Sequence, residues 1–404
     1  MVHRREGPHS LRDWCTHLAD FADEVRRFMV ERGMSLRGLA RAAGYDPSHL
    51  SKVLNGRKPA SPYLAARLDD ALGAGGKIRD AASSAPAPAA RRTEGSNGRL
   101  PRDAVTRADV EAVAVTTKAF RDLDNRFGGA HTHKLVAGYL ESSVTLMLRT
   151  GTYTEETGRQ LFGAAAQLAH LAAWTAYDMD DHRRSELYFS KALELASAAG
   201  DHAFAAEILA ARSHRAIHLG SPNRAIELAR ASGHIAARTG VSVLLAEAHE
   251  LEANGHALLG DGRACAASLH ECEHAFGRSS SAAVPAWLGY LDRAYLAARF
   301  AHTLRDLGDW GEAERYALEA SAMSRSLARA RAFNTALLAT AYVETDLDRA
   351  LGAGMEALGM AAELQSARVV RYVADFRRRL RQRHGNDPKA RDFDRQASEI
   401  LGSR

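Results

Sequence analysis

The chain has 404 residues, a net charge of +5, and a composition that is 46% hydrophobic, 7% aromatic and 25% charged. This size favours two or three domains with filled hydrophobic cores. The absence of any run of roughly eighteen uncharged apolar residues argues against a membrane protein, and three cysteines without a CxxC pair argue against a disulfide framework or a common zinc motif. We therefore expect a cytoplasmic protein with reduced thiols and no membrane contact.

Helix-favouring residues dominate the sequence, and between Pro101 and Pro388 the only prolines are Pro222 and Pro285. Because proline is the strongest helix breaker, this pattern predicts an all-α fold. Charge is uneven: residues 1–107 hold 19 Lys or Arg against 12 Asp or Glu, residues 368–383 hold 7 against 1, and the region between them is net acidic. The acidic middle is a poor DNA-binding surface, since phosphate contacts require Lys and Arg.

Two short helices joined by a tight turn are predicted within residues 35–59, SLRGLARAAGYDPSHLSKVLNGRKP. Ser35 and Asp46 are placed as N-caps, and Gly44 separates the helices. Each helix has an apolar side, formed by Leu36, Leu39 and Ala40 in the first and by Leu50, Val53 and Leu54 in the second. This arrangement is a helix-turn-helix, although an ordinary helical hairpin is the alternative.

Flanking helices complete the predicted N-terminal domain, which spans residues 11–78. An amphipathic helix is expected over residues 11–32, and another begins at Ser61-Pro62 and buries Leu64, Leu68 and Leu72. Residues 79–106 lack an apolar period and are rich in Ala, Pro, Ser and Gly, which predicts a flexible linker.

The spacing of Ala40, Gly44 and Leu50, followed by LNGRKPAS, resembles the helix-turn-helix of lambda-repressor-like, XRE-type regulators. The resemblance implies a double-stranded DNA operator, bound by a homodimer that reads two half-sites. Residues near the start of the recognition helix would read bases, and charged residues around it would contact phosphates. The candidate DNA contacts are Arg37, Ser48, His49, Ser51, Lys52, Asn55, Arg57 and Lys58.

Helical periodicity resumes at residue 107, with helices expected over residues 109–127 and 131–149. A turn residue followed five positions later by a small residue then recurs, at Asp180, Gly220, Gly260, Gly308 and Thr345. Each turn joins two helices, so residues 107–384 are predicted to form an α-solenoid of helix pairs, with an irregular bundle as the alternative. The longest step is explained by a loop-like insertion over residues 277–285.

The phrases RRSELYFSKALELA and LGDWGEAERYALEA resemble tetratricopeptide repeats. The resemblance implies that the first helix of each pair lines a concave face that binds a ligand, and it assigns the lining positions residue by residue. They suit a cationic or mixed ligand such as a peptide or a small molecule, but solvated helix surface is the alternative for any one of them. The candidates are His170, Trp174, Tyr177, Glu207, His214, Glu247, Glu250, Asn254, Tyr295, His302 and Arg305.

A basic amphipathic helix is predicted over residues 367–383, followed by a tail over residues 385–404. The helix fits the role of a cap on the solenoid, and its arginines are also able to contact DNA or an acidic partner. The pairs His270 with His274 and His214 with His218 have the i, i+4 spacing of metal ligands, but no clustered signature accompanies them. No catalytic motif is visible, so neither an enzyme nor a cofactor is expected.

The whole layout resembles actinobacterial XRE-type regulators with helical-repeat bodies, which are associated with development and secondary metabolism. It implies a transcription regulator whose repeat domain mediates dimerisation and senses a ligand. Two alternatives remain open. The repeat domain is a constitutive protein-docking scaffold in the first, and the N-terminal hairpin belongs to an adaptor or enzyme and binds protein instead of DNA in the second.

Overall fold

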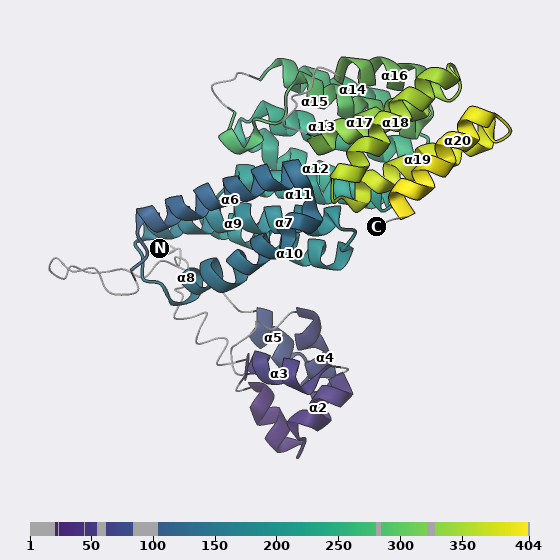
Figure 1. Cartoon of the computed structure of the whole chain (residues 1–404). Helices are drawn as coiled ribbons and strands as arrows, with labels where there is room; N and C mark the ends of the chain where they lie inside the picture. The colour runs from purple at the N-terminus through teal and green to yellow at the C-terminus, as the bar shows by residue number, and fades with distance from the viewer. Residues whose placement is uncertain are drawn as a thin grey trace. The chain divides into compact units, whose positions relative to one another are not determined.

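A computed structural model describes residues 21–22, 24–43, 45–54, 62–83, 104–279, 284–320 and 328–402. Within these ranges every regular secondary-structure element is a helix. The one β-type contact there is an isolated bridge between Ala104 and Thr152. The predicted all-α fold is confirmed. The chain divides into two compact units, one running to Val105 and including Gly151–Arg159, the other comprising Thr106–Thr150 and Gln160–Arg404 (Figure 1).

The N-terminal unit is a small helical bundle around one core. Residues 24–31 are helical and are followed by α2 (Leu36–Ala43), α3 (Pro47–Leu54), α4 (Pro62–Leu72) and α5 (Lys77–Ser83). The predicted apolar positions Leu39, Leu50, Leu64 and Leu68 are almost fully buried in this core. The helix-turn-helix is therefore present, with α3 in the place of the recognition helix.

Helix α5 extends this bundle beyond the predicted boundary at residue 78. The buried Asp69 carboxylate accepts the N–H groups of Gly76 at 2.8 Å and Ile78 at 3.0 Å, which fixes the turn from α4 into α5. Ile78 is then fully buried against the core. The segment 79–83, expected to belong to the linker, is helical because a buried carboxylate and one apolar side chain attach it to the bundle.

The second unit begins with α6 (Arg107–Phe127) and a long helical segment made of α7 (Gly129–Tyr139), a π-helical turn (Leu140–Val144) and α8 (Thr145–Thr150). Five helix pairs follow (Figure 1), at the places where the sequence predicted repeats. They are α9 (Glu155–Asp178) with α10 (His182–Ala199), α11 (His202–His218) with α12 (Pro222–Thr239), α13 (Ser242–Leu258) with α14 (Gly262–Gly277), α15 (Arg293–Leu307) with α16 (Trp310–Glu319), and α17 (Ala328–Tyr342) with α18 (Leu347–Glu363).

The turns inside these pairs explain the repeated sequence signal. Asp180, Gly220, Gly260 and Gly308 all have positive φ, between 64° and 91°, a conformation that lets the chain reverse immediately after a helix. The small residues five positions later are buried where the second helix packs on the first: Ser185, Ala225, Cys265, Ala313 and Ala350. All five pairs therefore share a small contact residue, and four of the five turns share a positive φ, which Thr345 lacks.

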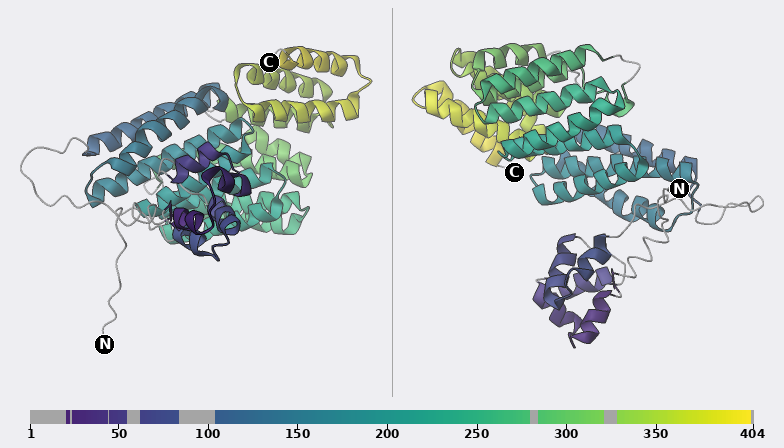
Figure 2. Two further views of the ribbon diagram at one scale, coloured as in Figure 1. Left: turned by 90° about the horizontal axis from the view of Figure 1, so that it is seen from below. Right: turned by 180° about the vertical axis from the view of Figure 1, so that it is seen from behind.

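The C-terminal residues form two further helices, α19 (Ala367–His384) and α20 (Pro388–Gly402), which lie antiparallel to each other (Figure 2). Residues 385–404 were expected to be a tail, but α20 packs onto the repeat body through Phe393, whose ring lies 5.2 Å from that of Phe376. Gly354 on α18 makes room for this contact, since a Cβ there would lie 2.3 Å from the Phe376 ring. Aromatic burial thus makes α20 part of the body.

We call the second unit the repeat unit. Backbone hydrogen bonds join the turn near its beginning to a turn near its end. The Gln365 N–H donates to the Phe127 carbonyl at 2.9 Å, and the Ala130 N–H donates to the Gln365 carbonyl at 3.2 Å. Gly128 permits this approach, since a Cβ on it would lie 2.6 Å from the Gln365 oxygen. The turn between α6 and α7 therefore packs backbone to backbone against the turn between α18 and α19.

Two buried carboxylates hold this junction in place, and we call them with Arg329 the closure cluster. Arg329 forms a bidentate pair with Asp124 at 2.9 and 2.8 Å and also reaches Asp178 at 3.4 Å. Asp178 additionally accepts the Gly129 N–H at 2.9 Å and the Ser366 hydroxyl at 2.8 Å. Five separate helices or turns are thereby connected through one ionic cluster.

Replacing Arg329 by Ala should strongly destabilise the repeat unit, because it leaves the buried Asp124 carboxylate without its cation and leaves Asp178 with only Arg368, at 3.9 Å. The expected loss is about 3–5 kcal/mol of unfolding free energy, measured by urea denaturation followed by circular dichroism. The control is Arg331→Ala, which removes a half-exposed arginine 3.9 Å from the exposed Glu356 and should cost under about 1 kcal/mol. Equal losses in the two variants would contradict the role given to Arg329.

Candidate functional site

Helix α3 presents one face to the core and the other to solvent. At its start, the Asp46 carboxylate accepts the N–H groups of Ser48 at 2.9 Å and His49 at 3.1 Å. The hydrogen bonds from His49 and Ser48 lower the pKa of Asp46, so the cap is ionised at neutral pH. With Leu50 and Val53 fully buried, the helix cannot rotate, and its polar side stays outward.

The predicted DNA contacts divide by exposure. Ser48 and Lys52 are exposed and lie one helical turn apart, which places them on the same face of α3. His49 is half-buried, with its ring 5.6 Å from that of Tyr45, and Ser51 is also half-buried. Arg37 is exposed on α2. The remaining candidates, Asn55, Arg57 and Lys58, lie outside the described residues.

Two arginines that sequence reasoning did not single out donate hydrogen bonds to the C-terminal ends of the two helices of the helix-turn-helix. Arg26 donates to the carbonyl of Leu54 at 2.6 Å, at the end of α3, and Arg67 donates to the carbonyl of Ala43 at 3.1 Å, at the end of α2. Positive charge at a helix C-terminus satisfies free carbonyls and the helix dipole. Exposed Arg41, one turn after Arg37, extends the basic surface of α2.

In the repeat unit, the eleven ligand candidates lie on α9, α11, α13 and α15 and are joined by hydrogen bonds, ion pairs and ring contacts, directly or through shared neighbours. We call this connected set the polar interior. Its members are His170, Trp174, Tyr177, Glu207, His214, Glu247, Glu250, Asn254, Tyr295, His302 and Arg305, together with Tyr290, Arg299, Asp306, Arg368 and Tyr372, which sequence reasoning missed.

A pair of carboxyl groups occupies one end of the polar interior. The Tyr290 hydroxyl lies 3.1 Å from Glu207 Oε1 and 3.2 Å from Glu247 Oε1, while the Oε2 atom of each glutamate is buried without a hydrogen-bond partner. Burial and the charge of Glu207 raise the pKa of Glu247 well above its ordinary value, and burial also raises the pKa of Glu207. Two close buried carboxyls cannot both ionise cheaply, so the pair retains a proton.

His170 links this acid pair to the aromatic part of the cluster. It accepts the Trp174 indole N–H at Nε2 over 3.0 Å, and the same nitrogen lies 3.9 Å from Glu207. Its Nδ1 is buried without a partner, and burial holds the pKa of His170 well below its ordinary value. The ring is therefore neutral, with its proton on Nδ1.

Arg299 is the central cation of the polar interior. It donates to Glu250 at 2.9 Å through Nε and contacts His214 Nδ1 at 3.0 Å through NH1, while its NH2 has no partner. Glu250 also accepts the Thr303 hydroxyl at 2.8 Å. Burial and then the charges of Arg299 and Arg368 lower the pKa of His214, so this histidine stays neutral between two guanidinium groups.

Helix α19 inserts its side chains among these residues. The Arg368 guanidinium lies 4.3 Å from the ring centroid of Tyr177 and 4.6 Å from that of Phe333. Tyr372 packs its ring 5.3 Å from His302 and lies 5.4 Å from the Arg305 guanidinium. Residues of the predicted basic cap thus occupy the face that the sequence predicted to be an open groove.

The last part of the polar interior is held by Asp306. It accepts the side-chain amide of Asn254 at 2.9 Å and an Nε donor of Arg305 at 2.8 Å, and Arg305 also contacts His302 at 3.4 Å. Asn254 is almost fully buried. Its amide donor is therefore already used within the chain, by an aspartate that sequence reasoning missed.

Unpartnered buried atoms distinguish the polar interior from an ordinary ion-pair network. They include the Tyr177 hydroxyl, Arg299 NH2 and Arg368 Nε, whereas the second oxygens of Glu207 and Glu247 can share the proton that this pair retains. Each unsatisfied group costs about 1–3 kcal/mol, so such groups need a reason. A ligand that both donates and accepts hydrogen bonds would satisfy several of them.

Within the described residues no group of three metal-ligating side chains converges. His270 and His274 do lie with ring centroids 4.4 Å apart, without a third ligand among those residues. The two described cysteines, Cys265 and Cys272, are buried free thiols. None of the described helices has the length and apolar content that a membrane crossing requires.

The acid pair gives the repeat unit a specific pH dependence. Because the folded chain keeps the Glu247 proton above pH 4.5 and the unfolded chain loses it, stability falls as pH rises through this range, by about 1.4 kcal/mol per pH unit. Glu247→Gln removes that loss, so its melting temperature should exceed the wild-type value at pH 7.5 and the gain should shrink towards pH 4.5. Exposed Glu356→Gln should show no such trend, and a pH-independent effect of Glu247→Gln would refute the shared proton.

Comparison with known proteins agrees with the N-terminal geometry. Residues 20–82 match the family model described as a helix-turn-helix domain, which includes α2 and α3. No curated protein matches the chain. A solved structure described as the crystal structure of the P58(IPK) TPR domain aligns with 95% of this chain and 99% of its own, at 16% identity and a TM-score of 0.23. Because that score is low, the repeat arrangement rests on the helix pairs themselves.

Proposed function

We propose that this chain is a cytoplasmic, sequence-specific DNA-binding transcription regulator. The observation that carries the proposal is α3, a capped helix in a helix-turn-helix with Ser48 and Lys52 exposed on one face. Side chains at such positions reach base edges when the helix enters the major groove. The family match over residues 20–82 supports the same reading.

A homodimer is the expected DNA-binding species, because one short recognition helix contacts too few bases for specific affinity. The repeat unit, which lies outside the basic N-terminal region, is the proposed dimerisation element. The resemblance to XRE-type regulators adds the expectation of a role in development or secondary metabolism.

Footprinting on a duplex selected from a random-sequence pool tests DNA reading. Wild-type protein should protect two half-sites whose centres lie about 34 Å apart. Lys52→Ala should weaken binding by about tenfold or more, and Lys52→Ala with Ser48→Ala should abolish the footprint, since both base-reading side chains are then lost.

Lys118→Ala is the matched control, because Lys118 is an exposed lysine of α6 that pairs with Asp122 at 3.3 Å. It should leave the footprint and its salt dependence unchanged. Failure of the wild-type protein to enrich any duplex would overturn the proposal and favour an adaptor in which the helix-turn-helix binds protein.

We further propose that the polar interior senses a peptide or small-molecule ligand with a basic group. The support is chemical: a guanidinium, that of Arg368, already lies between Tyr177 and Phe333, and unpartnered acceptors lie in the same cluster. A basic ligand would compete with Arg368 for these rings. Its effect on DNA binding is limited to its difference in affinity for the two arrangements of the body.

Chemical rescue of an Arg368 variant distinguishes a ligand-sensing repeat unit from a constitutive protein-docking scaffold. Arg368→Ala should change operator affinity, and N-ethylguanidine should restore the wild-type value because it replaces the missing guanidinium between two aromatic rings. N-ethylguanidine should not restore Arg371→Ala, which removes a neighbouring and more exposed arginine of α19. If Arg368→Ala folds cooperatively and binds the operator like wild type, the body is instead the constitutive docking scaffold.

A further inference from the structure

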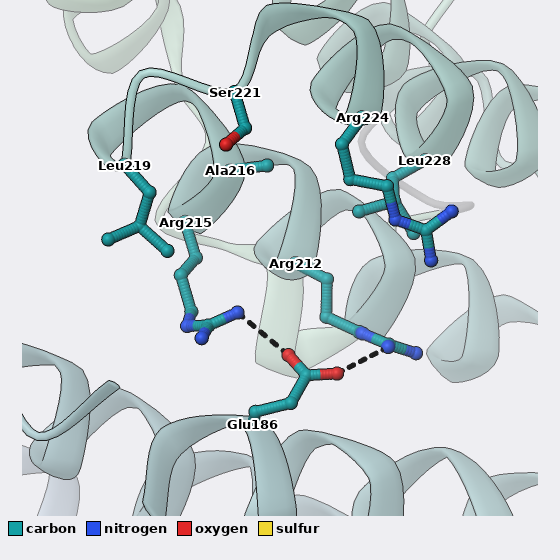
Figure 3. A pocket seen from close by; sticks show the side chains of 8 residues that line it. All are labelled: Glu186, Arg212, Arg215, Ala216, Leu219, Ser221, Arg224 and Leu228. Atoms are coloured by element: carbon teal, nitrogen blue, oxygen red, sulfur yellow. Dashed lines mark hydrogen bonds and ion pairs between the residues drawn. The ribbon is translucent and has the colours of Figure 1, made fainter. Parts of the chain in front are cut away.

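A small pocket opens on the repeat unit among α10, α11 and α12, apart from the polar interior (Figure 3). Its volume is about 260 Å³. Three of its eight lining residues are arginines and one is acidic: Glu186, Arg212, Arg215, Ala216, Leu219, Ser221, Arg224 and Leu228. This excess of positive charge favours an anionic occupant.

Arg212 and Arg215 are fixed in place by the single carboxylate. Arg212 NH2 donates to one oxygen of Glu186 at 2.5 Å and Arg215 NH1 to the other at 2.7 Å, and Arg215 also donates to the His182 carbonyl at 3.0 Å. Glu186 thus bridges the two guanidinium groups, as Figure 3 shows. Preorganised arginine forks of this kind bind oxyanions well, since little entropy is lost on binding.

Donor capacity remains after Glu186 is satisfied. The Nε atoms of Arg212 and Arg215 are both buried and have no hydrogen-bond partner. Arg224, on the opposite wall, has one contact to Glu227 at 2.9 Å and is more than half exposed. Three guanidinium groups line the pocket, and the single Glu186 carboxylate neutralises only part of their charge.

The start of α12 adds to the positive electrostatic potential of the pocket. This helix has 18 residues, and its N-cap Ser221 makes no side-chain cap hydrogen bond, so the hydroxyl is not used at the helix terminus. Figure 3 shows this hydroxyl directed into the pocket. The positive end of the α12 dipole stabilises an anion near this position, although Pro222 at the start of the helix supplies no N–H donor.

The chemistry favours a phosphomonoester. A dianionic phosphoryl group offers three acceptor oxygens, which match two arginine forks and a hydroxyl better than a carboxylate does. The pocket also has an apolar wall made by Ala216, Leu219 and Leu228. We infer that this pocket binds the phosphoryl group of a small phosphate ester, with the carbon chain of the ester against the leucines.

Calorimetric titration of the full chain with ethyl phosphate, at constant ionic strength, tests this inference. Saturable binding is expected, and Arg212→Gln should weaken it by about tenfold or more, because one charged hydrogen bond is lost. Arg224→Gln should also weaken it, and this exposed side chain carries little risk to folding.

Arg238→Gln is the control, because it removes an exposed arginine near the other end of α12. Equal effects of Arg224→Gln and Arg238→Gln, or binding that does not saturate, would overturn the site. Equal affinity for propionate would overturn the phosphate class, and equal affinity for inorganic phosphate would overturn the ester. The result is independent of DNA binding, so it stands or fails separately from the proposed function.

Discussion

The closure cluster is the constraint on which the repeat unit depends. Solenoids are normally open, and each repeat contacts only its neighbours. Here Arg329 is bonded to carboxylates of α6 and α9, and the turn at Gln365 is hydrogen-bonded to the turn at Gly128. Because the last helices are attached to the first, α19 is carried onto the inner side of α9 and α11. The position of Arg368 beside Tyr177 follows from this closure.

Most of the architecture could be predicted from sequence because its determinants are local. Caps such as Asp46, positive-φ turns such as Gly260 and small contact residues such as Ala313 act within a few positions of themselves. What sequence reasoning missed depends on partners far along the chain. Helix α20 packs against the repeat unit through the contact between Phe393 and Phe376, and the short helical pattern around residues 393–400 does not predict that contact.

The candidate site also contains residues that the sequence could predict and residues that depend on distant partners. The first-helix positions were found because the resemblance to tetratricopeptide repeats assigns them residue by residue, and Arg299 lies one helical turn after one of them, Tyr295. Tyr290 had no such signal, since it lies just after the insertion, yet its hydroxyl contacts both members of the acid pair. The helix that carries Arg368 was predicted to be a basic cap, because its arginines have no apolar spacing that indicates burial. The contacts between the first and last helices of the repeat unit decide whether α19 faces solvent or the polar interior. Those contacts join distant parts of the chain, so the local spacing of residues does not predict them.

The polar interior is difficult to explain by stability alone. A buried network of this kind generally contributes no more than packed apolar side chains of equal volume, and unpartnered atoms make it costlier. Under the proposed function that cost has a purpose. Ser366 donates to Asp178 in the closure cluster, and Arg368, two residues later, lies 3.9 Å from the same carboxylate. Under the proposed function, a ligand that displaces Arg368 would therefore act on the closure cluster as well as on the polar interior, and this shared segment is where ligand binding would change the arrangement of the repeat unit.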